Sequence, residues 1–165
     1  MMRKKAMEEI YLTYAPTVFK YLMCLTHDRS LSEDLTADTF ETAFRSIEKY
    51  RGDSKLSVWL CGIAKHLYHA EQRRISKMQW TEIDTEPLLS PQDIERDYAL
   101  KEEKISLYKE LQLLPPDMRE VFYLRMTGDM TFDEIGDILG HSGNWARVTF
   151  YRGKEKLKRR MQDEK

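Results

Sequence analysis

A basic segment with aromatic residues among its charges lies near the carboxyl end of the sequence, "NWARVTFYRGKEKLKRR" from Asn144 to Arg160. The side chains of Asn144 and Arg147 can each form paired hydrogen bonds with the edge of a base, and the methyl groups of Val148 can contact a thymine methyl group. The lysines and arginines from Lys154 onward suit phosphate groups, which position a protein on DNA without reading its sequence. The residue types therefore predict a DNA-contacting segment.

Small and apolar residues in the same segment recur at intervals of four, three and four, the spacing of one helix face. This stripe is predicted to pack on Ile135 and Leu139, and it consists of Ala146, Phe150, Gly153 and Leu157. The other faces remain for DNA, and the residues predicted to meet it are Ser142, Asn144, Trp145, Arg147, Val148, Thr149, Tyr151 and Arg152. The alternative is a structural helix with a solvated basic face, because basic residues near a helix carboxyl end also interact favourably with the helix dipole.

The residues before this segment carry the start and stop signals of a short helix. Thr131 and Glu134 have the spacing of a capping box, in which each side chain accepts a hydrogen bond from the other residue's backbone N–H. Gly140 and His141 predict a turn, and Ser142 can cap the next helix. A capped helix, a turn containing glycine and a basic second helix together have the layout of a helix-turn-helix.

A second set of reactive side chains, Cys61, His66 and His69, lies within one short segment. No fourth ligand occurs nearby at the spacing of a zinc finger, so we expect no metal site. The sequence has no glycine-rich phosphate loop, no nucleophile elbow and no paired carboxylates beyond those of ordinary helix faces. We therefore expect no catalytic activity and no cofactor.

The first half of the chain repeats apolar residues at helical spacing. Pro16 interrupts the first helical pattern and predicts either a kink or the first turn of a new helix. Ser30 and Glu33 have capping-box spacing and are expected to begin a second helix. After a loop at residues 50–55, a third helix is predicted, and Trp59 is expected in the core. The apolar face predicted for this helix consists of Leu56, Trp59, Leu60, Ile63 and Leu67.

Composition and charge favour two helical domains. Hydrophobic residues make up 41% of the 165 residues and charged residues 33%, which excludes the composition of a disordered chain. Five prolines and seven glycines are few, so an all-α fold is expected. Residues 81–103 contain eight acidic and two basic residues, whereas residues 142–165 contain three acidic and eight basic ones. The chain is therefore predicted to form two small helical domains joined by an acidic linker, the second carrying the helix-turn-helix.

Cysteine content and hydropathy predict the cellular compartment. Cys24 and Cys61 are too few for a disulfide framework, so both are expected to be reduced thiols. No stretch approaches the roughly 20 apolar residues needed to span a bilayer. We therefore expect a cytoplasmic protein with no direct membrane insertion.

Three segments, in order, resemble the bacterial sigma factors of the extracytoplasmic-function group. "SEDLTADTFETAF" is similar to the family's helix that docks on the clamp helices of core RNA polymerase. "YRGDSKLSVWLCGIAKHLYHAEQRR" is similar to the segment that melts and reads the promoter's minus-ten element. "LPPDMREVFYLRMTGDMTFDEIGDILGHSGNWARVTFYRGKEKLKR" resembles region four, which reads the minus-thirty-five element. The resemblance implies sigma region two at residues 5–75, a linker at 76–97 and sigma region four at 98–160.

The resemblance also implies which residues contact each partner. Core polymerase is expected to bind Asp34, Asp38, Thr39 and Glu41, three of which form an acidic helix face that suits basic groups on a partner. Minus-ten DNA is expected to contact Tyr50, Arg51, Lys55, Leu56, Lys65, His66, His69, Arg73 and Arg74. Minus-thirty-five DNA is assigned the DNA-facing residues of the basic helix given above. The chain departs from the family at His66 and Ala70, where Asn and Asp are common, and at Asn144 and Trp145, where a Gly-Thr pair is common.

These assignments imply an alternative sigma factor that binds core RNA polymerase and promoter DNA, in a stress or envelope response. The family also implies an anti-sigma factor that clamps between the two domains and can hold the protein at the membrane. The expected mechanism is recruitment and strand separation, since the polymerase performs the chemistry. A stand-alone helix-turn-helix regulator is the alternative; it needs a dimer interface or an effector domain, and the sequence shows no heptad run. A pure protein-interaction module leaves the basic helix unexplained.

Overall fold

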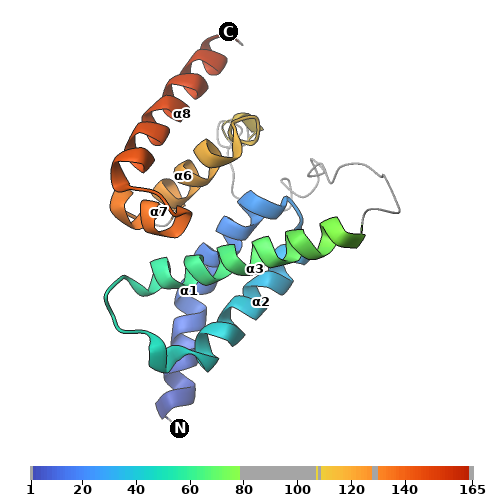
Figure 1. The fold of residues 1–165 in the computed structure, drawn as a ribbon, viewed down its shortest axis with the longest axis vertical. Helices are drawn as coiled ribbons and strands as arrows, with labels where there is room; N and C mark the ends of the chain where they lie inside the picture. The colour runs from blue at the N-terminus through green and yellow to red at the C-terminus, as the bar shows by residue number, and fades with distance from the viewer. Residues whose placement is uncertain (1, 79–106, 108, 128–129, 164–165) are drawn as a thin grey trace. The chain divides into compact units, whose positions relative to one another are not determined.

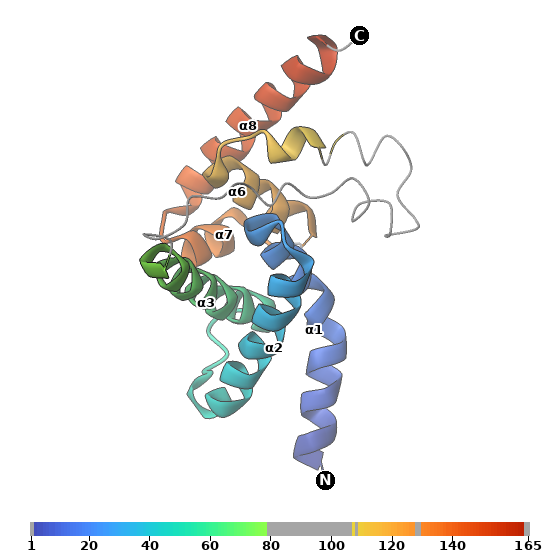
Figure 2. The ribbon, with the colours of Figure 1, turned by 90° about the vertical axis from the view of Figure 1, so that its right-hand side faces the viewer.

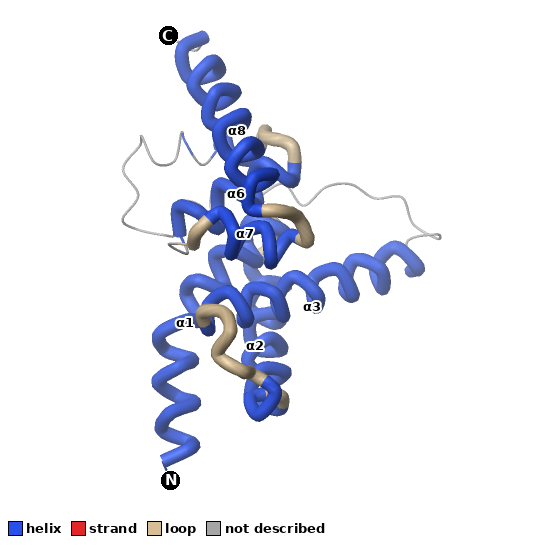
Figure 3. The backbone as a smooth tube through the Cα atoms, turned by 60° about the vertical axis from the view of Figure 1, so that its left-hand side comes forward, coloured by secondary structure: helices blue, strands red, loops and turns tan. Residues whose placement is uncertain are grey.

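The computed structural model describes residues 2–78, 107, 109–127 and 130–163, and all regular elements within these ranges are helices (Figure 1 and Figure 3). The chain forms two compact units, Met1–Glu86 and Pro87–Lys165. The described elements agree with the all-α prediction. The acidic linker predicted at 76–97 lies outside the described residues beyond residue 78, and so does the start of the helix predicted near Ala99. None of the described helices combines the length and the apolar composition that a bilayer span requires.

Within residues 2–78 the first unit is a group of three α-helices, each in contact with the other two. Its elements are α1 (Met2–Thr26), α2 (Arg29–Arg45), the 3-10 helix η1 (Ile47–Lys49) and α3 (Leu56–Met78). α1 and α2 run side by side in opposite directions, and α3 packs on both (Figure 1 and Figure 2). Their shared core contains fully buried residues of each helix, among them Tyr21, Leu22, Thr39 and Leu60.

Helix α1 continues through Pro16, so the alternative that a new helix begins there is wrong. Proline lacks the N–H that would bond to the carbonyl group of Leu12, and its ring crowds that carbonyl. Leu12 and Pro16 are both exposed, so water can bond to the carbonyl group that the proline leaves free. The helix therefore tolerates a proline on its solvent face.

Asp28, rather than Ser30, begins the second helix. The Asp28 carboxylate accepts a hydrogen bond from the backbone N–H of Leu31 at 3.0 Å, and its backbone is extended, as an N-cap requires. Ser30 lies inside the first turn, so the predicted capping box of Ser30 and Glu33 is wrong. Glu33 instead pairs with Arg29 one turn before it, at 3.1 Å. Asp and Ser are equally good N-caps, so spacing alone did not separate the two candidates.

The buried face of α3 is rotated relative to the predicted one. Leu60 is buried as predicted, but the other four residues of the predicted stripe, Trp59 among them, are only half-buried. The buried residues are Val58, Leu60, Cys61 and Ala64. Small side chains such as those of Cys61 and Ala64 allow helices to approach closely, so a pattern built from the largest apolar residues placed the face wrongly.

The second unit contains α6 (Pro116–Thr127), α7 (Phe132–Leu139) and α8 (Gly143–Asp163). Pro116 is the first residue of α6, as predicted from the tolerance of a helix's first turn for proline. α8 packs along α6, and α7 contacts both of them (Figure 1). The rings of Phe122 and Phe150 stack with their centroids 4.6 Å apart and join α6 to α8. Leu111, Leu114 and Leu157 complete the buried cluster around Phe122.

Candidate nucleic-acid interface

Helix α7 begins and ends as the sequence predicts. The backbone N–H of Glu134 donates to Thr131 Oγ1 at 3.2 Å, and the backbone N–H of Thr131 donates to Glu134 Oε2 at 2.8 Å, so both halves of the capping box are present. Gly140 ends the helix with a φ of 74°, a left-handed conformation that glycine adopts without steric cost. These two ends fix the length of the helix that precedes the turn.

The turn between α7 and α8 lies directly against α7. The backbone N–H of His141 donates to the carbonyl oxygen of Gly136 at 2.8 Å. A Cβ atom on Gly136 would lie 2.6 Å from the carbonyl oxygen of His141 and 2.9 Å from that of Ser142. Glycine at position 136 therefore allows the backbone of the turn to approach α7 so closely. At Gly143 a Cβ atom would meet the carboxylate of Asp133, a side chain that can move aside, so the close backbone approach is specific to Gly136.

Two local hydrogen bonds order the first turn of α8. Ser142 Oγ accepts a hydrogen bond from the backbone N–H of Trp145 at 3.1 Å, which confirms the predicted N-cap. The guanidinium of Arg147 donates to Asn144 Oδ1 at 3.2 Å. The amide of Asn144 and the guanidinium of Arg147 are therefore held next to each other on the exposed surface.

The buried stripe of α8 agrees with the prediction and contains one further residue. Ala146, Gly153 and Leu157 are buried, and Phe150 packs on the core of the unit. Thr149 is only 8% exposed and belongs to the same stripe. Its side chain is covered by the protein itself, so it is not part of the exposed surface of α8, and its contact with DNA stays a prediction.

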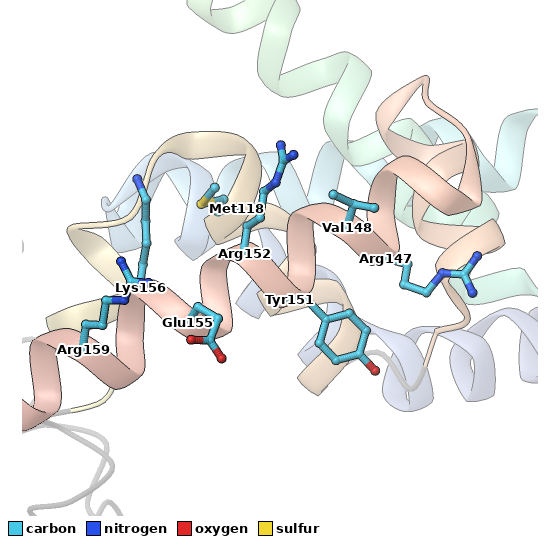
Figure 4. Close-up of a pocket in the computed structure, with 8 residues that line it drawn as sticks. All are labelled: Met118, Arg147, Val148, Tyr151, Arg152, Glu155, Lys156 and Arg159. Atoms are coloured by element: carbon cyan, nitrogen blue, oxygen red, sulfur yellow. The ribbon is translucent and has the colours of Figure 1, made fainter.

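The opposite side of α8 is exposed and basic. Val148 is 38% exposed and Tyr151 is 53% exposed, so apolar surface lies between the charges. A shallow groove follows this side (Figure 4), and it is lined by Met118 of α6 together with Arg147, Val148, Tyr151, Arg152, Glu155, Lys156 and Arg159 of α8. Cations that surround exposed aromatic and aliphatic carbon suit a polyanion with apolar groups between its charges, as the DNA major groove presents.

Three residues near this surface were not predicted as site residues from the sequence. Met118 reaches the groove from α6, and Glu155 is an acidic residue within the basic face. His141 stacks on Trp145 with the ring centroids 3.7 Å apart and the ring planes at 11°. The four-residue spacing of His141 and Trp145 was visible in the sequence, but the stack depends on the path of the turn.

The acidic residues predicted on the second helix lie on its solvent face. Asp34, Asp38 and Glu41 are exposed on α2. Glu41 forms an ion pair with Arg45 at 2.5 Å, whereas neither aspartate forms an ion pair within the described part of the chain. Thr39 is fully buried and its hydroxyl donates to the carbonyl oxygen of Leu35 at 2.6 Å. Thr39 is therefore not part of the exposed face of α2, and its contact with a partner stays a prediction.

The loop before α3 is closed by Tyr50. Its hydroxyl donates to the carbonyl oxygen of Ser54, and its ring packs against Trp59 with the centroids 5.1 Å apart. Arg51 and Lys55 are exposed on this loop. The hydrogen bond between Tyr50 and Ser54 therefore joins the two ends of the loop, and the cationic side chains of Arg51 and Lys55 lie on its exposed side.

Helix α3 extends to Met78, three residues past the predicted domain boundary at residue 75. Four of the residues predicted as minus-ten contacts are exposed on it, His66, His69, Arg73 and Arg74. Lys65 and Leu56, also predicted as DNA contacts, are half-buried. Arg74 forms two hydrogen bonds with Glu71, of 3.0 and 2.5 Å. These bonds lower the pKa of the Glu71 carboxyl group and keep it charged.

The candidate metal ligands of α3 do not form a cluster. Cys61 is buried while His66 and His69 are exposed, so the three side chains face different environments. Within residues 2–78, 107, 109–127 and 130–163, no three His, Cys, Asp or Glu side chains lie close enough to share a metal ion. Burial raises the pKa of the Cys61 thiol to about 12. The thiol is therefore protonated and unreactive at neutral pH.

Comparison with known proteins gives two family matches in the order of the two units. Residues 10–77 match the family model "Sigma-70 region 2", and residues 104–157 match "Sigma-70, region 4". The RNA polymerase sigma factor YlaC of Bacillus subtilis is 31% identical over 164 residues, which cover 98% of this chain and 95% of YlaC. The ECF RNA polymerase sigma factor SigM of the same organism is 26% identical and covers 92% of both chains.

A solved structure supports the same architecture. The sigma factor RpoE of Bartonella quintana, crystallised in complex with the anti-sigma factor NepR, has a TM-score of 0.77 over 98% of this chain and 99% of its own. The two sequences are 18% identical, so this likeness concerns the fold.

Proposed function

Because this chain belongs to the extracytoplasmic-function group of RNA polymerase sigma factors, it is a non-catalytic initiation subunit, and we propose which of its surfaces carry each step. The first unit docks on core RNA polymerase and opens the promoter at the minus-ten element. The second unit binds the minus-thirty-five element through α8. The observation that carries the second assignment is the exposed basic face of α8 with Val148 and Tyr151 between its cations.

The docking surface is the acidic face of α2. Asp34 and Asp38 carry charges that no ion pair offsets within the described residues, whereas Arg45 offsets the charge of Glu41. Exposed carboxylates at helical spacing attract basic groups on a partner and fix its orientation. Asp34 and Asp38 are therefore the principal docking residues, and Glu41 contributes less.

The promoter-opening surface is the loop at residues 50–55 together with the exposed face of α3. Separating the strands costs a few kcal/mol for each base that leaves the stack, so the displaced strand must be bound as it forms. The cations of this surface, which suit phosphates, are Arg51, Lys55, Lys65, Arg73 and Arg74. His66 and His69 offer ring N–H groups on the same exposed face, and half-buried Leu56 offers apolar contact at the start of the helix.

The minus-thirty-five surface is the exposed side of α8. Its residues are Ser142, Asn144, Trp145, Arg147, Val148, Tyr151 and Arg152. Arg147 and Asn144, which are bonded to each other, present their remaining donors at the first turn, where a recognition helix meets base edges. Lys156 and Arg159 lie farther along the same groove and suit phosphates.

Regulation by an anti-sigma factor is part of the same proposal. RpoE of Bartonella quintana, which shares the fold, was crystallised with such a partner. The acidic face of α2 and the basic face of α8 are the surfaces that a regulator must cover to prevent polymerase and promoter binding. We place the protein in the cytoplasm, held at the membrane when its regulator is a membrane protein.

Run-off transcription with purified core RNA polymerase tests the proposal. The templates are genomic fragments, including the region upstream of this gene, and each reaction is run with and without the protein. We expect discrete transcripts that require both the protein and core enzyme. Tight and specific duplex binding by the protein alone, without transcripts, would instead support a stand-alone regulator.

Arg147→Ala is the matched variant for the transcription assay, because Arg147 is exposed and contacts only Asn144 among the described hydrogen bonds. We expect weaker promoter use with unchanged core binding. Equal loss of promoter use and core binding would show that α8 does not act on DNA separately from the polymerase.

A further inference from the structure

The imidazole of His141 and the indole of Trp145 form a parallel stack at the amino-terminal end of α8. Their centroids are 3.7 Å apart and their planes differ by 11°, so the imidazole covers part of one indole face. His141 is exposed and Trp145 is half-buried. The stack therefore lies at the surface, and it joins the turn to Trp145, one of the residues assigned to minus-thirty-five DNA.

The backbone on both sides of this stack is fixed. The N–H of His141 donates to the carbonyl oxygen of Gly136, and no room remains for a Cβ atom between Gly136 and the turn. The N–H of Trp145 donates to Ser142 Oγ. With both backbones held, the imidazole limits the indole to a narrow range of orientations.

This orientation restricts what the indole can contact. A base cannot stack on the indole face that the imidazole covers, while the edge of the ring that carries the N–H is left uncovered by the imidazole. The indole N–H of half-buried Trp145 is a donor without an acceptor function, and it gains a protein or DNA partner when an interface buries it. Among the described residues no hydrogen bond satisfies it.

We propose that His141 is a positioning residue that holds the Trp145 indole so that its N–H donates to a backbone phosphate of the minus-thirty-five element. A phosphate offers acceptor oxygens at every step of a duplex, and such contacts set the register of a recognition helix. The proposal rests on the assignment of α8 to DNA. It gives Trp145 a role in positioning the helix, with base reading left to Arg147 and Asn144.

Binding of holoenzyme, reconstituted from core polymerase and the full chain, to a labelled promoter duplex tests this proposal. Trp145→Phe removes the indole N–H, and we expect about tenfold weaker binding, the effect of one hydrogen bond to a charged group. We expect His141→Ala to weaken binding by a similar factor. His141→Phe keeps a flat ring for stacking and should retain most of the affinity.

Two further readouts separate positioning from a general structural effect. In a ¹⁵N–¹H spectrum of the free chain, the Trp145 indole resonance should shift in His141→Ala, because the neighbouring ring is lost, while thermal unfolding stays within a few degrees. The loss caused by Trp145→Phe should be the same for promoters that differ at single minus-thirty-five base pairs. A loss confined to one base pair would overturn the phosphate contact.

Arg147→Ala distinguishes failure of this inference from failure of the functional assignment. If Arg147→Ala weakens binding and His141→Ala does not, His141 has no positioning role and the assignment of α8 stands. If neither variant nor Trp145→Phe changes binding, α8 is not the DNA-binding surface and both proposals fail.

Discussion

The hydroxyl of Tyr50 donates a hydrogen bond to the backbone carbonyl oxygen of Ser54, 2.5 Å away, and closes the loop that precedes α3. The Tyr50 ring is also held by Trp59. A side chain bound on two sides inside the protein has few donors or faces left for DNA. Tyr50, which the sequence suggested as a minus-ten contact, is therefore better placed to hold the loop in shape for the exposed cations around it.

Tyr50→Phe should loosen this loop without unfolding the unit. The substitution removes one hydrogen bond, worth about 1 kcal/mol, and leaves the contact with Trp59 in place. We expect faster amide hydrogen exchange at residues 51–55 in the free protein and slower promoter opening, followed by permanganate reactivity of the minus-ten thymines. Tyr50→Ala, which also removes the ring, should have the larger effect in both assays. Slower opening with unchanged exchange would show that the hydroxyl acts on DNA directly.

Asp38→Arg should weaken docking on core polymerase by about tenfold or more, because it places a like charge against the basic groups expected on the partner. The measurement is competition with a labelled copy of the wild-type protein for core enzyme. At saturating core enzyme, promoter binding by the holoenzyme should not change.

Thr39→Val is the matched control for Asp38→Arg. Thr39 neighbours Asp38 in sequence but is fully buried, and its hydroxyl bonds to its own helix. We expect unchanged competition for core enzyme and a small loss of thermal stability. If Thr39→Val is fully folded under the assay conditions and still competes less well for core enzyme, the assignment of docking to the exposed carboxylates is contradicted.

The helix-turn-helix could be predicted because its signals act over three or four residues of backbone. Thr131, Glu134, Gly140 and Ser142 each perform the capping or turning role that their spacing indicated. Such contacts depend on local geometry, so sequence indicates them wherever one candidate cap stands alone, unlike the start of α2, where Asp28 and Ser30 compete. The stack of His141 on Trp145 also spans four residues, but it requires a particular turn path that the spacing does not encode.

Thr39 and Thr149 show why the burial of a side chain was harder to predict from the sequence than the capping residues of the helix-turn-helix. Thr39 satisfies its hydroxyl on the carbonyl group of Leu35, so it can be buried like an apolar residue. Thr149 lies beside the predicted stripe of α8, and the width of the buried face decides whether it is covered. Both outcomes depend on how closely a neighbouring helix packs, which a single helix's pattern does not contain.

Asp28→Ala should destabilise the first unit, because the backbone N–H of Leu31 loses its acceptor. Loss of an N-cap costs about 1 kcal/mol. Ser30→Ala tests the cap that the sequence suggested, and we expect it to change stability by only a few tenths of a kcal/mol. Urea denaturation followed by circular dichroism gives both values. A larger loss for Ser30→Ala than for Asp28→Ala would contradict the observed cap.

The Cys61 thiol should resist alkylation in the folded protein. Its pKa is raised to about 12 by burial, so the reactive thiolate is scarce at pH 8 and the sulfur is also inaccessible. We expect slow labelling by iodoacetamide in buffer and fast labelling in about 8 M urea, which unfolds the protein. Mass spectrometry identifies the modified residue. Because the pKa is raised, labelling of the folded protein should remain slow up to about pH 10. Rapid labelling at pH 8 would show that α3 opens readily.

Gly136→Ala should destabilise the helix-turn-helix, although a glycine-to-alanine change inside a helix normally stabilises the helix. The new Cβ atom would lie 2.6 Å from the carbonyl oxygen of His141, so the backbone of the turn has to move. Overpacking of this kind costs about 1–3 kcal/mol, and we expect reduced stability together with weaker minus-thirty-five binding. Gly62→Ala is the control, because nothing lies within 4 Å of a Cβ atom there and alanine favours a helix by roughly 0.5–1 kcal/mol. Urea denaturation of the full chain and duplex binding by the holoenzyme provide the two readouts. Equal changes in the free energy of unfolding for the two substitutions would mean that the turn has room to move away from α7. The close approach of the turn to Gly136 would then not be the contact that fixes His141 before the recognition helix.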